Sequence, residues 1–258
     1  MDISMRSCRA LCIVIVFLFS AQLQADECSS IRVGQSSNWF PVAYTNADMG
    51  TSEGIAIDVL MLLEQHLSIP VEFDQELPWL RVHKQLENGS LDMVTGLYWT
   101  SKRTDYLQYT KPYFVNEARV FVLKENQFEF QTVEDLQNKV GGLPTGGSYG
   151  EQFDTFAENY DLPIERVADK EQLIGKLLAG RNDYFILDFN DGMSFIKQSK
   201  LEQKIVALPQ PVSVTEVFMA ISKHSPCIKH LSSINELLIQ IKQDGRLNDI
   251  IEKHVKPL

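Results

Sequence analysis

Two adjacent cations, Lys102 and Arg103, stand at a point in the chain where they could bind an anion. They follow Thr100, a residue type suited to cap the beginning of a helix. Positive charges in the first turn of a helix oppose the helix dipole, at a cost of about 0.3–1 kcal/mol each. A carboxylate bound by free N–H groups and by the Arg103 guanidinium would remove that conflict. The segment therefore predicts either a carboxylate site or two solvated cations.

A glycine-rich segment, residues 146–150 (GGSYG), also contains residue types that could do chemistry. It matches the G-x-S-x-G pattern of hydrolases and lies between a predicted strand and a predicted helix, with Ser148 in the position of the nucleophile. A carboxylate and a base follow in hydrolase order, namely Asp188 and one of His224, His230 and His254. No HGGG-like segment that could form an oxyanion hole lies upstream, which argues against a hydrolase.

Residues 141–148 also resemble a phosphate-binding loop, in which backbone N–H groups surround phosphates. Such a loop requires a lysine where this chain has Gly147, so the sequence argues against an NTPase. The five histidines form no H-E-x-x-H, H-x-x-E-H or comparable spacing. No metal and no cofactor are therefore expected. The remaining interpretation of the glycine-rich segment is a turn at a helix N-terminus that faces a ligand.

A further candidate is Asp188, which directly follows an apolar run of strand length, residues 184–187. In α/β sheets, ligands bind in the crevice at the carboxyl ends of the strands, where a carboxylate can hold a cationic group. The alternative is that Asp188 caps the helix after it. Trp39 lies in the loop after the first predicted strand, and a bulky aromatic there can be an ordinary core residue.

The elements that must position these residues alternate between strands and helices. Apolar or alternating runs predict strands, and apolar residues at helical spacing before a glycine predict helices. Strands are expected at 31–34, 70–73, 93–95, 118–124, 139–143, 184–187 and 214–221, and helices at 59–66, 80–86, 151–159, 172–179 and 228–255. Residues 86–92 and 178–183 share a helix end, a glycine and an aspartate, which suggests two similarly built halves. This alternation indicates an α/β fold with a parallel sheet.

The first 25 residues have a different character from the rest of the chain. Arg6 and Arg9 precede an apolar run at 10–19 that is too short to span a bilayer, and a polar stretch ends at Ala25. This pattern predicts a signal peptide at residues 1–25. No later segment approaches the roughly 18 apolar residues of a spanning helix. The mature protein is therefore expected to be exported and soluble.

The charge of the chain limits its possible binding partners, and its cysteine content suggests a disulfide. Removal of the signal takes Lys plus Arg from 24 to 22 and Asp plus Glu from 34 to 33, which leaves a net charge of −11. Such an acidic chain is a poor candidate for binding nucleic acid or anionic membranes. Cys28 and Cys227 remain, an even number in an oxidising compartment, which suggests one disulfide, with two free buried thiols as the alternative.

Residues 91–114 read LDMVTGLYWTSKRTDYLQYTKPYF. This segment resembles the signature of the family 3 bacterial solute-binding proteins, the periplasmic receptors for polar amino acids. The signature is a strand that opens with Asp and ends near Gly, then Thr-x-x-Arg, then an aromatic segment ending in Pro-Tyr-Tyr/Phe. The matching residues are Asp92, Gly96, Thr100, Arg103 and Pro112-Tyr113-Phe114, with one residue fewer between Asp and Gly than in the family. The resemblance extends over nearly the whole mature chain.

The resemblance implies roles for the candidate residues. Arg103 would bind the α-carboxylate of an amino acid, Asp188 its ammonium group, and Trp39 would stack on its side chain. The glycine-rich turn would contribute hydrogen-bond donors from a second lobe. Tyr98 departs from the family, which usually has Thr or Ser there, so its phenol would reshape the pocket. The implied ligand-binding residues are Trp39, Gly96, Tyr98, Arg103, Gly147, Ser148 and Asp188.

The resemblance also implies a fold and a function. The fold would be the α/β two-lobed periplasmic-binding-protein fold of type II, with a ligand cleft between lobes joined by two crossover strands. Lobe 1 would comprise residues 28–122 and 216–258, and lobe 2 residues 123–215. The expected function is capture of a small polar, amino-acid-like ligand by a periplasmic, non-enzymatic monomer for an inner-membrane ABC permease. The alternatives are an enzyme resembling cyclohexadienyl dehydratase and a ligand sensor for a membrane kinase.

Overall fold

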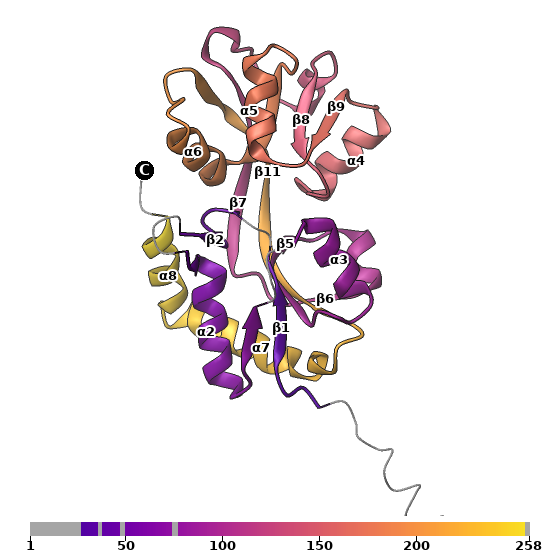
Figure 1. Cartoon of the computed structure of the whole chain (residues 1–258), viewed down its shortest axis with the longest axis vertical. Helices are drawn as coiled ribbons and strands as arrows, with labels where there is room; N and C mark the ends of the chain where they lie inside the picture. The colour runs from indigo at the N-terminus through magenta and orange to yellow at the C-terminus, as the bar shows by residue number, and fades with distance from the viewer. Residues whose placement is uncertain (1–26, 36–37, 47–49, 74–76, 256–258) are drawn as a thin grey trace, which may run out of the picture.

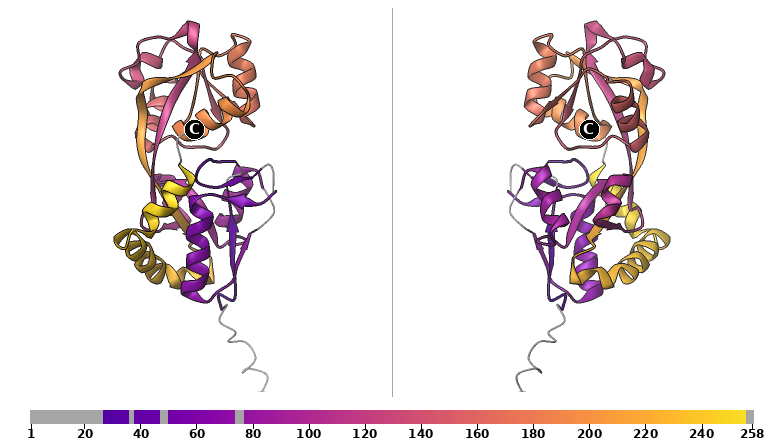
Figure 2. Two further views of the ribbon diagram at one scale, coloured as in Figure 1. Left: turned by 90° about the vertical axis from the view of Figure 1, so that its left-hand side faces the viewer. Right: turned by 90° about the vertical axis from the view of Figure 1, so that its right-hand side faces the viewer.

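The computed structural model describes residues 27–35, 38–46, 50–73 and 77–255, and the predicted signal peptide lies outside them. In this part of the chain, two α/β lobes lie one above the other and are joined by two long strands (Figure 1). The joining strands are β7 (Phe114–Leu123) and β11 (Ile205–Ser222), which pair antiparallel. Figure 2 shows the yellow C-terminal helices beside the indigo and purple N-terminal elements, so the first and last described elements share a lobe.

The first lobe is built on parallel strands. β1 (Ile31–Gly34) lies between β4 (Val71–Phe73) and β5 (Met93–Tyr98). The helices of this lobe are α2 (Ile55–Leu67), α3 (Trp79–Glu87), α7 (Leu231–Gln243) and α8 (Arg246–His254). Its short elements are β2 (Tyr44–Thr45), β3 (Ser52–Glu53), β6 (Leu107–Tyr109), η1 (Ser101–Asp105) and η4 (Pro226–His230). The largest core cluster joins the apolar faces of α2 and α7 to these strands, with Ile31, Leu60, Leu63, Ile234 and Leu238 fully buried.

The second lobe repeats this plan. β8 (Gly141–Pro144) lies between β9 (Ile164–Val167) and β10 (Tyr184–Asp188), again in parallel. Its helices are α4 (Glu151–Asn159), α5 (Lys170–Leu178) and α6 (Phe189–Gln198), with the short η2 (Lys124–Asn126) and η3 (Val133–Leu136). Alternate residues of β10 enter two core clusters, which is why this strand reads as a continuous apolar run. The strand orders β4-β1-β5 and β9-β8-β10 match, in agreement with the similar halves that the sequence suggests.

The joining strands make the sheet mixed rather than purely parallel. β11 pairs antiparallel with β5, and β7 pairs antiparallel with β10. β11 is much longer than the expected strand at 214–221, and its register shifts around Pro211, where proline cannot donate a ladder hydrogen bond. Pairing with β7 along most of its length extends this strand beyond what local sequence signals indicate.

Other differences from the sequence-based expectations have local causes. α2 begins at Ile55, four residues earlier than expected, because Gly54 has φ 132° and packs on the backbone of Val42, where a side chain would clash. The segment after Thr100 begins a helix as expected, but this helix is the short 3₁₀ helix η1. Strands β6 and β9 and the β2–β3 pair were not predicted, because tertiary pairing rather than periodicity defines them. Helix α6 was also not predicted.

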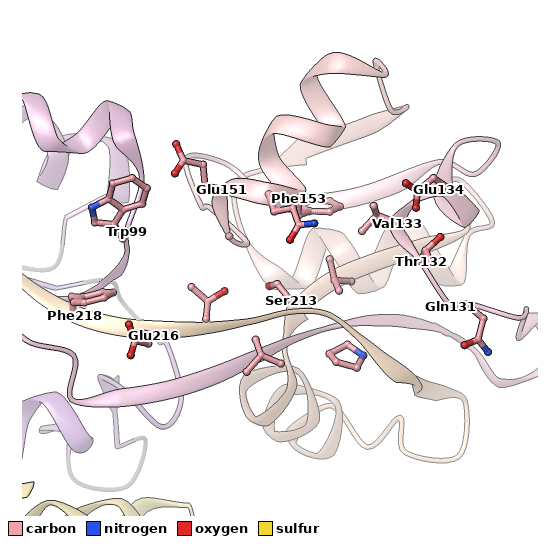
Figure 3. Close-up of a pocket in the computed structure, with 16 residues that line it drawn as sticks. Trp99, Gln131, Thr132, Val133, Glu134, Glu151, Phe153, Ser213, Glu216 and Phe218 are labelled. Carbon is pink, nitrogen blue, oxygen red and sulfur yellow. The ribbon is translucent and has the colours of Figure 1, made fainter.

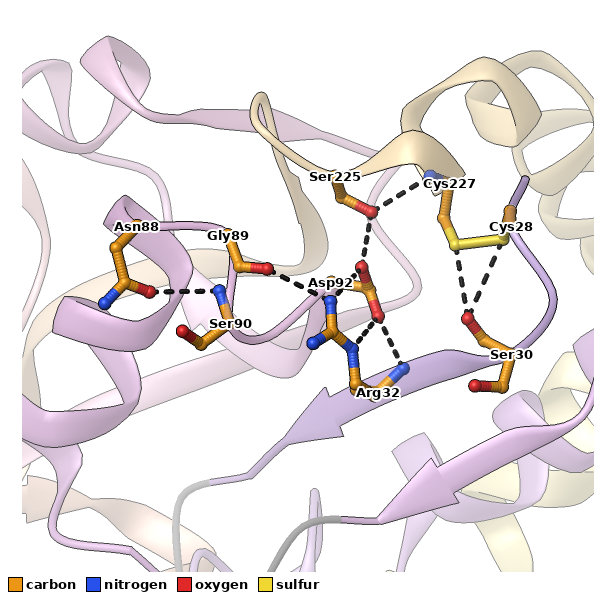
Figure 4. A network of polar contacts seen from close by, with 9 residues as sticks. All are labelled: Cys28, Ser30, Arg32, Asn88, Gly89, Ser90, Asp92, Ser225 and Cys227. Carbon is orange, nitrogen blue, oxygen red and sulfur yellow. Dashed lines mark hydrogen bonds and ion pairs between the residues drawn. A yellow bond between two sulfur atoms is a disulfide. The ribbon is translucent and has the colours of Figure 1, made fainter. Parts of the chain in front are cut away.

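Cys28 and Cys227 form the predicted disulfide, with a Cα–Cα distance of 4.8 Å (Figure 4). Beside it, the buried carboxylate of Asp92 accepts hydrogen bonds from Arg32 Nε at 2.8 Å and from the Ser225 hydroxyl at 2.7 Å. The Ser225 hydroxyl in turn accepts a bond from the backbone N–H of Cys227. Asp92, the opening aspartate of the signature segment, therefore joins β1 and β5 to the C-terminal helices and has a structural role.

Candidate ligand-binding site

A cavity of about 820 Å³ lies between the two lobes. Its walls come from segments that follow the carboxyl ends of parallel strands β1, β5, β8 and β10, where α/β sheets bind ligands. No histidine is among the described residues that line it. Of the seven predicted site residues, the cavity is lined by Trp39, Tyr98, Arg103, Gly147, Ser148 and Asp188.

Asp188 makes two polar contacts between the lobes within the cavity. It is the last residue of β10 and the N-cap residue of α6, but its side chain makes no capping hydrogen bond. Its Oδ2 accepts a hydrogen bond from Trp39 Nε1 at 2.6 Å, and its Oδ1 accepts one from the Tyr98 hydroxyl. The helix-cap interpretation is therefore wrong for the side chain, because both oxygens are directed to the first lobe.

The environment of Asp188 favours its protonated form more than usual. The pKa of this carboxyl is raised to about 7, mainly by burial. The nearby Asp191 carboxylate also raises this pKa, while the hydrogen bonds from Tyr98 and Trp39 and the charge of Lys170 lower it. The Tyr98 phenol has a pKa well above its ordinary value, through burial and through the charge of Asp188. Tyr98 is therefore a neutral donor at any physiological pH. A cationic group placed here would favour the ionised carboxylate.

Arg103 is buried, unlike its neighbour Lys102, whose side chain is 83% exposed. The Arg103 guanidinium donates to the carbonyl of Tyr98 at 2.9 Å and to that of Gly146 at 3.5 Å. It also lies 5.9 Å from the centre of the Trp79 ring. η1 is too short to supply a helix dipole, so a bound anion would have to be held by the guanidinium itself. One of the two predicted cations thus enters the cavity and the other is solvated.

The glycine-rich turn does not carry a hydrolase triad. The Ser148 hydroxyl donates to Asp154 of α4, which also accepts the backbone N–H of Tyr149 at 3.1 Å. Within the described ranges, the backbone N–H groups of Gly147 and Ser148 have no acceptor. Those two N–H groups, not the Ser148 hydroxyl, are what this turn offers to a ligand.

Gly96 is the predicted site residue that does not line the cavity. It lies behind Trp39, and a Cβ on Gly96 would come within 3.1 Å of the Trp39 ring and 2.8 Å of Val42. Trp39 meets Tyr98 edge to face, with ring centres 5.5 Å apart. The absence of a side chain at Gly96 therefore allows Trp39 to reach Asp188.

Sequence reasoning missed several polar residues of the cavity wall, among them Trp79, Lys170 and Asp191. Trp79 Nε1 donates to the carbonyl of Gly146 at 3.0 Å, which is a further contact between the lobes. Lys170 and Asp191 form an ion pair at 2.5 Å, with side chains 19% and 6% exposed. Lys170 opens a helix that follows the unpredicted β9, and Asp191 lies in the unpredicted α6. If β9 and α6 had been predicted, both residues could have been assigned to the cleft.

A second hollow, of about 750 Å³, shares no lining residue with the first. It lies along β11, with Trp99 and Phe218 at one end and Gln131, Thr132 and Glu134 at the other (Figure 3). None of the predicted site residues lines it. The cavity between the lobes is therefore the candidate ligand-binding site.

A two-lobed α/β protein with a polar cavity between its lobes has the architecture of a receptor that encloses a small solute. The family model for the bacterial extracellular solute-binding proteins, family 3, matches residues 31–257. The chain belongs to this family, whose members bind solutes and are not classed as enzymes. The predicted family and fold class are confirmed. Among the described residues, no helix has the length and apolar character needed to cross a membrane.

Individual relatives are distant. The probable amino-acid-binding protein YxeM of Bacillus subtilis (strain 168) is 21% identical over 225 residues, which cover 87% of this chain and 83% of that protein. A histidine kinase sensor domain with similarity to periplasmic binding proteins has a TM-score of 0.77 at 20% identity, covering 88% of this chain and 96% of that one. An ancestral arginine-binding protein bound to arginine has a TM-score of 0.75 at 22% identity, with 88% and 98% covered. At these identities the solved structures show the fold alone.

Proposed function

We propose that this protein captures an amino acid in the periplasm and delivers it to an inner-membrane ABC permease. The observation that carries the proposal is the pairing of opposite charges across one cavity. Arg103 of the first lobe and Asp188 of the second are both buried and both line the cavity. A zwitterion that binds between them neutralises both charges as water is excluded. The names of the relatives, which include amino-acid-binding proteins, support this class of ligand.

The proposal includes a division into lobes that close by a hinge. Residues 28–122 and 216–258 form one lobe and residues 123–215 the other, with β7 and β11 as the crossovers. The core clusters favour a change of lobe earlier in β7 than residue 122, because Phe114 packs in the first lobe whereas Ala118, Val120 and Val122 pack in the second. This packing supports a hinge near the first-lobe end of β7. The N-terminal pattern at 1–25 supports export through a cleaved signal peptide.

A ligand screen tests the proposal directly. The mature protein is unfolded and refolded with its disulfide intact to remove bound solutes. Its thermal unfolding is then followed with each proteinogenic amino acid, with amines and with dicarboxylates. A true ligand at 100 times its Kd stabilises the folded state by about 2.7 kcal/mol, which raises Tm by several degrees. If amino acids leave Tm unchanged while simple amines or dicarboxylates raise it, the proposed ligand class is wrong.

Replacement of Arg103 by methionine is expected to weaken binding of the screened amino acid at least about tenfold. The physical reason is the loss of a buried charge-assisted contact, worth about 1.5–3 kcal/mol. Methionine keeps much of the apolar volume beside Trp79. Calorimetry measures the change.

The adjacent Lys102→Met variant is the matched control. Lys102 is solvated and has only a weak surface contact with Glu158 at 3.4 Å, so its removal is expected to leave affinity unchanged. Equal affinities of the two variants would contradict the carboxylate assignment for Arg103.

Ligand binding near pH 7 is expected to release protons from Asp188. Its pKa of about 7 in the folded protein exceeds the ordinary value of 3.8, so the protonated form is populated at neutral pH. A ligand ammonium favours the ionised form and lowers this pKa, which releases up to about half a proton per ligand at pH 7. Calorimetry in buffers of different ionisation enthalpy measures the release. The effect should disappear at pH 9 and in Asp188→Asn, and buffer-independent enthalpies at pH 7 would contradict it.

The same pKa sets the sign of a pH effect on folding. Because the folded-state pKa lies above 3.8, the contribution of Asp188 to stability is greatest below about pH 3.8 and is lost as the pH rises through about 7. A bound cation restores that contribution at higher pH.

A role as the soluble sensor of a membrane kinase is the second candidate, favoured by the likeness to a kinase sensor domain. A pull-down of the ligand-loaded protein from membranes separates a permease from a kinase partner. The enzymatic alternative is separated by incubation with prephenate or arogenate, because only a dehydratase would form product.

A further inference from the structure

The Lys170–Asp191 ion pair belongs to the second lobe, but its contacts extend beyond that lobe. Lys170 is the first residue of α5 and Asp191 lies in the first turn of α6, and their side chains meet at 2.5 Å. The pair lies in the cavity wall, and Asp191 is 6% exposed. Removing two charges from water is costly unless further hydrogen bonds satisfy them.

Both charged groups complete their hydrogen bonds with the backbone of the first lobe. Lys170 Nζ donates to the carbonyl oxygen of Asn38. Asp191 Oδ1 accepts the backbone N–H of Phe40 at 3.1 Å. The pair therefore holds the residues on either side of Trp39, whose own indole N–H reaches Asp188.

We propose that the Lys170–Asp191 pair is a positioning device that closes the cleft through the Trp39 loop, whichever ligand is bound. Its partners in the first lobe are backbone groups, which are the same for any ligand, and no ligand atom is needed to form the contacts. Asp188 and Arg103 select the ligand, and the Lys170–Asp191 pair stabilises the closed form. This inference deepens the proposed solute-capture function and rests on it.

The decisive variant is Lys170→Met combined with Asp191→Leu. Replacement of both members of a buried ion pair by apolar residues of similar volume is often neutral or stabilising for folding. The double variant removes both bonds to the Trp39 loop without leaving an unpaired charge. The matched control is Lys176→Met combined with Glu165→Leu, which removes the 2.5 Å ion pair between α5 and β9 within the second lobe.

Small-angle scattering of the refolded, ligand-free proteins tests the inference without any ligand. The wild type and the control variant are expected to have the same radius of gyration. The double variant is expected to be larger, by an amount on the order of 1 Å, because the lobes of the ligand-free protein spend more time apart. Identical radii for all three proteins would overturn the inference, and this outcome is independent of whether amino acids bind.

Dissociation kinetics provide the second readout, with L-arginine and L-glutamine as the probes. For each probe that binds, the double variant is expected to dissociate about tenfold or more faster, with the ratio between the two probes unchanged. A change in that ratio would assign the pair to ligand selection instead and overturn the inference. Failure of both probes to bind the wild type would count against the proposed function, while the scattering result would still decide the role of the pair.

Discussion

Asp188→Asn is expected to weaken zwitterionic amino acids by about 100-fold or more while leaving the fold intact. A hundredfold loss corresponds to about 2.7 kcal/mol, within the range for removing one member of a buried hydrogen-bonded charge pair. Asparagine can direct its carbonyl to the Trp39 indole, which can only donate, and its NH₂ group to the Tyr98 hydroxyl, which can also accept. The variant therefore loses the negative charge of Asp188 but can keep its hydrogen bonds to Trp39 and Tyr98.

The form of the loss is as informative as its size. Analogues that lack the amine should be weakened much less than the amino acid itself, because they never made use of the Asp188 charge. Scattering should show compaction on ligand addition in the wild type and little in the variant, because the ammonium contact draws the second lobe onto the ligand.

Asp183→Asn is the matched control for Asp188→Asn. Asp183 immediately precedes β10, accepts the backbone N–H of Val140 at 2.7 Å and is not among the residues that line the cavity. The control is expected to bind like the wild type. A best ligand without a cationic group, or equal affinities in the two variants, would remove the ammonium role from Asp188.

Loss of the Cys28–Cys227 disulfide is expected to lower the free energy of unfolding by about 2–5 kcal/mol. The bridge closes a sequence separation of 199 residues. For a loop of that length, the chain-entropy model gives about 5 kcal/mol as the upper value. Urea unfolding of the oxidised and reduced wild type isolates the cross-link itself, and the Cys28→Ser/Cys227→Ser variant confirms it.

Ligand affinity should be nearly unchanged in the reduced protein. The disulfide lies beside Asp92 and Arg32, away from the cavity lining (Figure 4). The urea m value should rise, because the uncrosslinked denatured chain exposes more surface. A stability loss below about 1 kcal/mol would show that the reduced denatured state retains structure near this end of the first lobe.

The unusual residue Tyr98 is explained by the contacts that its phenol makes. Its hydroxyl donates to Asp188, so it occupies space and a carboxylate lone pair that Ser or Thr would leave to the ligand or to water. This arrangement, together with Trp39, predicts a smaller and drier ammonium site than the family pattern implies. It also accounts for the raised pKa of Asp188, since burial is its main cause.

Local sequence determined much of the fold. Strand β1, helix α4 and the end of α5 before Gly180 lie where short-range signals predict them, because periodicity and glycine stops act within a single element. The cysteine pair could also be predicted, because only two cysteines follow the signal pattern. The signature segment led to the family and, with it, to the two-lobed fold.

Only the tertiary structure decided how the site residues are used. The sequence allowed Asp188 to be either a helix cap or a carboxylate in the cleft. The contact that decides between these two roles is the hydrogen bond with Trp39, which lies 149 residues away in the sequence. The sequence also allowed both Lys102 and Arg103 to be solvated. The hydrogen bond from Arg103 to the carbonyl of Gly146, in the other lobe, distinguishes Arg103 from Lys102. The Lys170–Asp191 pair had no motif at all. Propensity and spacing describe one element at a time, whereas the cavity is formed where the carboxyl ends of strands from two lobes meet, and packing alone determines which side chains converge there.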